Sequence, residues 1–244
     1  MSSIRHLMRG VTAAALMGLA GFANAATVGG SASAFLFLDN LQMAVIFGTG
    51  APDEAVNGTT LVSATADDVT DSDAALGVFV TLDATATSNF GTASSLSAPG
   101  VISAAAASTL PGVASAEVAR SGQVNFLGAG TLVLQIPYQL QVDMPTLPDA
   151  GSHASASIVL NAFRLNSSTA QYSSSALLLF DQESGPGSSL TDGFLSLAIP
   201  FIDGDQYLFT ADVEAAVVTS VVPVPPALWL LGSAVVVLGR RRAR

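Results

Sequence analysis

The chain has 244 residues, half of them hydrophobic, with no cysteine and a formal net charge of −10 at pH 7. The absence of cysteine excludes disulfides, thiolate nucleophiles and cysteine-based metal sites. Residues 26–222 contain two arginines and eighteen acidic residues, so the formal charge of this part is −16. This charge disfavours nucleic acid as a partner, because phosphate binding needs clustered basic side chains.

The N-terminus has the three parts of a signal peptide. Two arginines precede an uncharged stretch over residues 10–21, and small residues follow at Ala23 and Ala25. Small side chains at these two positions are what signal peptidase admits, so we predict that residues 1–25 are removed before Ala26. An uncleaved anchor helix is the alternative.

Short apolar or alternating segments predict strands through the middle of the chain, and breaks rich in glycine and proline separate them. The expected short strands are Phe35–Leu38, Met43–Phe47, Gly77–Leu82, Ser155–Leu165 and Ala176–Phe180. The expected turns are 57–58, 99–100, 111–112 and 185–187. The run 103–108 favours strand or loop over helix, because alanine is enriched along the whole chain.

The densest acidic group contains Asp67, Asp68, Asp71 and Asp73. We interpret it as a solvated loop, with a weak calcium site as the alternative because hard oxygen ligands close in sequence suit that ion. The spacing does not match an EF-hand loop. Paired carboxylates also serve glycoside hydrolysis, but sequence spacing cannot place two of them across a sugar.

The clearest strand is predicted over Thr131–Met144, where apolar residues occupy every second position. Pro137 on the outward face removes a ladder donor, so we expect an edge strand or a bend there.

His153 is the one imidazole left once the signal peptide is removed. It lies in a segment typical of turns, and no serine occupies a Gly-x-Ser-x-Gly elbow. We therefore predict a solvated loop residue without a catalytic role.

Alternation returns from Leu195 to Phe201 and from Tyr207 to Val217. Asp203–Gly204 between the two runs predicts a hairpin, because glycine accepts the positive φ of tight turns. Many short strands without a long helical stripe indicate one antiparallel β-sandwich or jelly roll over residues 26–221.

The tail, residues 222–244, combines a proline motif, an apolar helix over 227–239 and a terminal arginine cluster. At about 1.5 Å per residue the helix spans roughly 20 Å of a core about 30 Å thick, so it is a minimal span aided by snorkelling arginines. Basic flanks stay in the cytoplasm, so the domain faces outward. The motif residues are Val222, Pro223, Val224, Pro225 and Pro226, and the anchor residues are Leu228, Trp229, Leu230, Leu231, Arg240, Arg241 and Arg242.

This order of features resembles the PEP-CTERM family of sorting signals, and especially its variant that reads Val-Pro-x-Pro-Ala. The resemblance implies recognition by an exosortase, a membrane-embedded cysteine transpeptidase, and cleavage near the proline motif. It also implies a Gram-negative host that makes exopolysaccharide. In this chain Val224 stands where the parent motif has glutamate, and Pro226 stands where alanine is usual. An unprocessed single-pass anchor is the alternative.

The sequence thus predicts a non-enzymatic exported protein without a cofactor. Its precursor would be anchored in the inner membrane, and the mature form would lie at the cell surface or outside the cell, in a structural, adhesive or polysaccharide-associated role. One alternative is a secreted carbohydrate-active hydrolase with paired carboxylates in a cleft. Another is a carbohydrate-binding module with exposed aromatic rings on one flat face, drawn from Tyr138, Tyr172, Tyr207 and the phenylalanines.

Overall fold

The computed structural model describes residues 29–77, 80–109, 111–144, 152–165, 171–181, 184 and 186–220. Within these ranges the chain forms thirteen strands and one short 3-10 helix, η1 (Leu38–Asn40), and no α-helix. The predicted all-β class with antiparallel sheets is confirmed.

Sheet A contains seven strands in the order β12-β9-β1-β7-β6-β5, with β2 pairing to β9 beside β1. Its strands are β1 (Gly29–Phe37), β2 (Gln42–Ile46), β5 (Leu82–Thr87), β6 (Gly91–Ala98), β7 (Val101–Thr109), β9 (Gly130–Met144) and β12 (Gly187–Phe201).

Sheet B contains six strands in the order β11-β10-β13-β8-β3-β4. Its strands are β3 (Ala51–Ala66), β4 (Val69–Leu76), β8 (Gly112–Leu127), β10 (His153–Arg164), β11 (Gln171–Phe180) and β13 (Gln206–Thr219).

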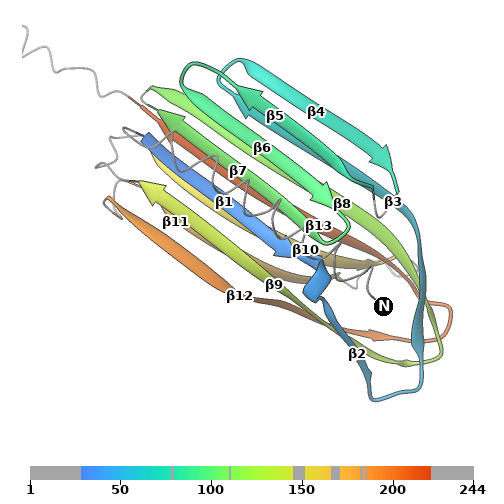
Figure 1. Cartoon of the computed structure of the whole chain (residues 1–244). Helices are drawn as coiled ribbons and strands as arrows, with labels where there is room; N and C mark the ends of the chain where they lie inside the picture. Colours follow the sequence, from blue (N-terminus) through green and yellow to red (C-terminus); the bar gives the residue numbers. More distant parts are fainter. Residues whose placement is uncertain are drawn as a thin grey trace, which may run out of the picture.

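The two sheets lie face to face as a sandwich (Figure 1). β1 and β7 of sheet A contact β13 of sheet B, and β6 contacts both β3 and β8. Every second residue along most strands is buried between the sheets, which is the burial pattern that period-two sequences produce.

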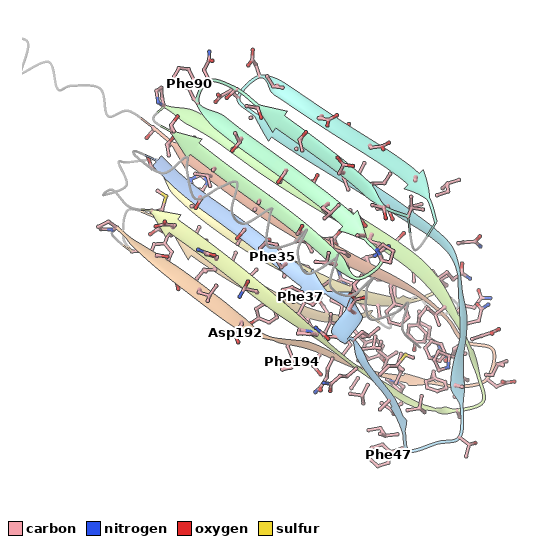
Figure 2. The ribbon with its side chains drawn as sticks, in the orientation of Figure 1. Phe35, Phe37, Phe47, Phe90, Asp192 and Phe194 are labelled. Carbon is pink, nitrogen blue, oxygen red and sulfur yellow. The ribbon has the colours of Figure 1, made fainter. Side chains whose placement is uncertain are left out.

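The core is filled differently at its two ends. Where β7 ends and β8 begins, the inner positions carry alanines that are fully or almost fully buried, among them Ala104, Ala106, Ala114 and Ala116. At the opposite end, which includes β2, large side chains fill the interior (Figure 2). There the ring of Phe126 packs against the rings of Phe201 and Tyr207, with centroids 4.4 and 5.5 Å away.

β13 ends in a buried hydroxyl network at the alanine end of the core. Thr219 Oγ1 accepts a hydrogen bond from the Gly112 N–H at 3.1 Å and donates to the Thr109 carbonyl at 2.8 Å. One residue later, the Ser220 N–H donates to Ser152 Oγ at 3.0 Å. These bonds fix the place where the chain leaves the middle of sheet B.

The strand predicted over Thr131–Met144 is confirmed as β9, but the edge position expected from Pro137 is wrong. β9 is an inner strand with β12 along one side. On its other side β2 pairs with residues 131–135 and β1 pairs with residues 138–143. Pro137 lies in the gap between these two ladders, so an interior strand tolerates it.

The predicted hairpin at Asp203–Gly204 is also wrong, although both strands and the turn exist. β12 belongs to sheet A and β13 to sheet B, so the turn is an arch that crosses between the sheets. Two of its backbone hydrogen bonds join it to β8: the Phe126 N–H donates to the Asp205 carbonyl at 2.8 Å, and the Gly204 N–H donates to the Phe126 carbonyl at 3.0 Å.

The acidic segment is a strand for most of its length, which corrects the loop prediction. Asp67 and Asp68 form the turn of the β3–β4 hairpin, and Asp71 and Asp73 lie in β4 at the edge of sheet B. Exposed carboxylates on an edge strand oppose pairing with another sheet, so a polar segment suits this position.

Two other local predictions fail. Asn57–Gly58 lies inside β3, where the register against β8 shifts and Asn57 has a φ of +53°, so it is a bulge and not a turn. In the described part of the expected strand Gly77–Leu82, Leu82 alone is in a strand. The run 103–108 lies in β7, so the preference for strand or loop over helix is confirmed.

The signal residues Ala23, Ala25 and Ala26 and the tail 222–244 lie outside the described residues. Of the part that the structure describes, no helix has the length and apolar character needed to cross a membrane.

Candidate functional site

The acidic residues of the β3–β4 hairpin contact backbone and hydroxyl donors. Asp67 has a φ of +51°, and its carboxylate accepts hydrogen bonds from Ser88 Oγ and from the Val113 N–H. The Ser88 bond, with a smaller contribution from Val113, lowers the pKa of Asp67 below its usual range. Asp67 thereby joins the β3–β4 turn to the β5–β6 turn and to the start of β8.

Asp71 contributes a contact between the sheets, because its Oδ2 accepts a hydrogen bond from the Thr85 N–H of β5 at 2.9 Å. Asp73 Oδ1 accepts from the N–H of the next residue at 2.8 Å, and Asp68 is exposed in the turn. Among the described residues no three His, Asp or Glu side chains gather in a group that could hold a metal ion.

His153 is the first residue of β10 and is half-buried. The predicted loop position is therefore corrected to a strand end. The preceding residue, Ser152, is hydrogen-bonded to Ser220.

The outer face of sheet A carries aromatic rings beside amides and carboxylates. Phe35, Gln139 and Asp192 lie in one row across β1, β9 and β12, and Phe194 lies opposite Pro137 in the next row. Phe37, two residues beyond Phe35, stacks on it with a centroid distance of 6.2 Å and an interplanar angle of 9°. Figure 2 shows these labelled side chains near one another.

Exposure differs among these rings. Phe194 is 58 % exposed, Phe37 is half-buried and Phe35 is buried. The strand spacing of about 4.8 Å places Phe37 and Phe194, which are two strands apart, roughly 10 Å from each other. We call Phe37, Gln139, Asp192 and Phe194 the outer-face strip.

The tyrosines that the sequence offered for a flat carbohydrate-binding face pack inside the sandwich. Tyr207 is fully buried and donates its hydroxyl hydrogen to the Pro200 carbonyl at 2.8 Å, and burial raises its pKa to about 12. Tyr138 and Tyr172 are half-buried and pack against the core. Near Tyr207, Arg164 forms an ion pair with the buried Asp205, whose other oxygen accepts from the Ile202 N–H at 2.9 Å.

A cavity of about 520 Å³ lies between the sheets at the end with large side chains. Sheet A contributes Ile102, Leu134 and Ile136, and sheet B contributes Leu160 and Phe209. Most of the lining is apolar. The described lining also includes one acidic residue, the exposed Asp53, and one basic residue, Arg120.

Arg120 is the unusual member of this lining. It is an inward-facing residue of β8 and is 7 % exposed, and its Nη1 donates to the Ala98 carbonyl at 3.2 Å. Burial lowers its pKa, because a charged guanidinium loses hydration there. One feature of the sequence could have pointed to Arg120: it is one of two arginines between residues 26 and 222.

The strip and the cavity could not be found from sequence patterns. The strip depends on β1, β9 and β12 being neighbours although they are far apart in the chain, and the cavity depends on which strands face each other. No protein-family model, curated protein or solved structure matches this chain.

Proposed function

We propose that the protein is exported, anchored through its tail in the inner membrane, cleaved by an exosortase and delivered to the cell surface or the extracellular matrix. There its β domain associates with extracellular polysaccharide without catalysing a reaction. The observation that carries this proposal is the order of the tail in the sequence: proline motif, apolar segment with Trp229, then arginines. The signal-like N-terminus supports the same route.

The outer-face strip supports polysaccharide as the partner. Aromatic rings can stack on the apolar faces of sugar rings, and the side chains of Gln139 and Asp192 can hydrogen-bond to sugar hydroxyls. The domain's balance of −16 favours a neutral polysaccharide over an acidic one, because like charges repel.

The sorting step is tested by intact-mass analysis of the native protein from its own cells, with and without the exosortase gene. The proposal expects a mass that begins at Ala26 and ends near the motif 222–226, and it expects this form to disappear when the gene is deleted. A mass that keeps Trp229 and the terminal arginines in both strains would establish an unprocessed membrane anchor instead.

Polysaccharide binding is tested with the cells' own exopolysaccharide, by the retention of the protein on the immobilised polymer. Replacing Phe194 by alanine removes the most exposed ring of the strip. This should weaken binding by roughly tenfold, because one aromatic contact contributes about that factor to the affinity. Phe90→Ala is the matched control, because Phe90 is 46 % exposed at the β5–β6 turn, away from the strip (Figure 2).

Equal retention of the wild type and Phe194→Ala would contradict the strip as a binding surface. Release of new reducing ends from the polymer during the experiment would instead favour the carbohydrate-active hydrolase.

A further inference from the structure

The cavity has the size and lining of a site for a small molecule. Its volume of about 520 Å³ falls within the range of roughly 300–1,000 Å³ that ligand pockets occupy in proteins. Such pockets combine an apolar wall with few polar groups. Here both sheets supply the wall, so an occupant would lie in the layer where core side chains normally interdigitate.

The mouth of the cavity is apolar as well. Leu41, which connects η1 to β2, and Met43 of β2 line the cavity and are 41 % and 56 % exposed. Apolar side chains gathered at an opening are unfavourable in water and mark places where an apolar partner contacts a protein.

Arg120 provides the polar end of the site. It is the most deeply buried charged residue of the described lining, whereas Leu41 and Met43 lie at the exposed part. A guanidinium offers five N–H donors in a planar fork that matches a carboxylate. An acidic head group would meet a positive charge inside a domain whose balance is otherwise strongly negative.

We infer that the cavity binds an anionic amphiphile of the fatty-acid class, with its carboxylate at Arg120 and its alkyl chain directed toward Leu41 and Met43. The charge of Arg120 selects the head group, and the apolar walls from β7, β9, β10 and β13 hold the chain. This site is independent of the outer-face strip, which lies on the other side of sheet A.

The test titrates the full chain with dodecanoate, below the concentration at which it forms micelles, and follows heat or the displacement of a fluorescent probe. Arg120→Gln should weaken dodecanoate binding by roughly ten- to a hundredfold, the value of hydrogen bonds to a charged group, and leave dodecanol binding nearly unchanged. The signal and tail segments are the same in every variant, so differences between variants report on the cavity.

A second variant fills the cavity without touching the charge. Ala211 lines the cavity and is 8 % exposed, so Ala211→Phe should abolish binding of both dodecanoate and dodecanol. Ala198→Phe is the matched control, because Ala198 is exposed on the outer face of β12. Unchanged dodecanoate binding in Ala211→Phe would overturn the site. Equal loss of acid and alcohol in a folded Arg120→Gln variant would overturn the role of the charge.

Discussion

Single residues of this domain connect turns and sheets that are distant in sequence. Asp67 is the clearest case, since one carboxylate accepts hydrogen bonds from the β5–β6 turn and from the start of β8. Asp71 similarly links β4 to β5 across the two sheets. These two aspartates therefore have a structural use that their sequence spacing did not reveal.

We expect Asp67→Asn to lower the free energy of unfolding at pH 7 by about 1 kcal/mol. This is less than the roughly 1.5–3 kcal/mol of hydrogen bonds to charged groups, because Asp67 is partly exposed. Folding lowers the pKa of Asp67, so its contribution is full above the unfolded value of about 3.9 and is lost as the pH falls through the folded pKa. Urea unfolding of both proteins from pH 7 to acid checks this.

The difference between wild type and Asp67→Asn should therefore shrink in acid. Asp68→Asn, at the neighbouring exposed position, is the control and should leave the free energy of unfolding at pH 7 unchanged. A difference that stays constant down to low pH would show that the charge of Asp67 is not responsible.

At the scale of elements, alternation identified strands well but could not assign them to sheets. β9, β10 and both partners of the arch were predicted from period-two patterns.

The wrong hairpin prediction at Asp203–Gly204 has a physical cause, which lies in the numbering of the apolar residues. In a hairpin with a two-residue turn at 203–204, residue 201 would pair with residue 206. Paired residues lie on the same face of a sheet, so odd-numbered residues of one strand would share a face with even-numbered residues of the other. Both strands carry their apolar residues at odd numbers, so a hairpin would expose one of the two apolar sets. An arch between the sheets buries both sets.

Strands with small or polar side chains were missed, or left undecided between strand and loop, for a different reason. β6 reads GTASSLSA and β7 reads VISAAAAST, and their inner positions are mostly alanine and serine. Such residues carry too little contrast in hydrophobicity for a period to be detected. They are buried because small residues of one sheet face small residues of the other sheet. The sequence of a single strand does not show this match.

The arch depends on its glycine. Gly204 has a φ of +79° and nothing within 4 Å of an added Cβ, so Gly204→Ala introduces backbone strain without a clash. We expect a loss of about 1 kcal/mol in the free energy of unfolding. Gly187→Ala is the control, because an added Cβ there meets Phe180 at an ordinary 3.4 Å. Equal stability of the two variants in chemical denaturation would contradict the strain.

At the scale of the whole molecule, the core changes from tightly packed alanine at one end to large side chains and a cavity at the other. The same substitution should therefore have opposite consequences along the sandwich. Small residues in a filled layer leave no space for extra methylene groups, whereas a lining residue of a cavity can grow into it.

We expect Ala106→Leu, at a position that is 1 % exposed, to reduce the free energy of unfolding by about 1–3 kcal/mol through overpacking. Ala211→Leu, beside the cavity, should be neutral or stabilising. Thermal and urea unfolding of the two variants check this contrast. A similar loss in both would show that the cavity does not exist in solution.

The position of Thr219 has a mechanical consequence. The chain leaves the described domain just after β13, a strand held on one side by β8 and on the other by β10. A pull applied at residue 220 along the strand loads both ladders in shear, so many hydrogen bonds resist together and do not open one after another. If the domain is tethered through its C-terminal end, its attachment point is thus in one of the parts of the fold most resistant to traction.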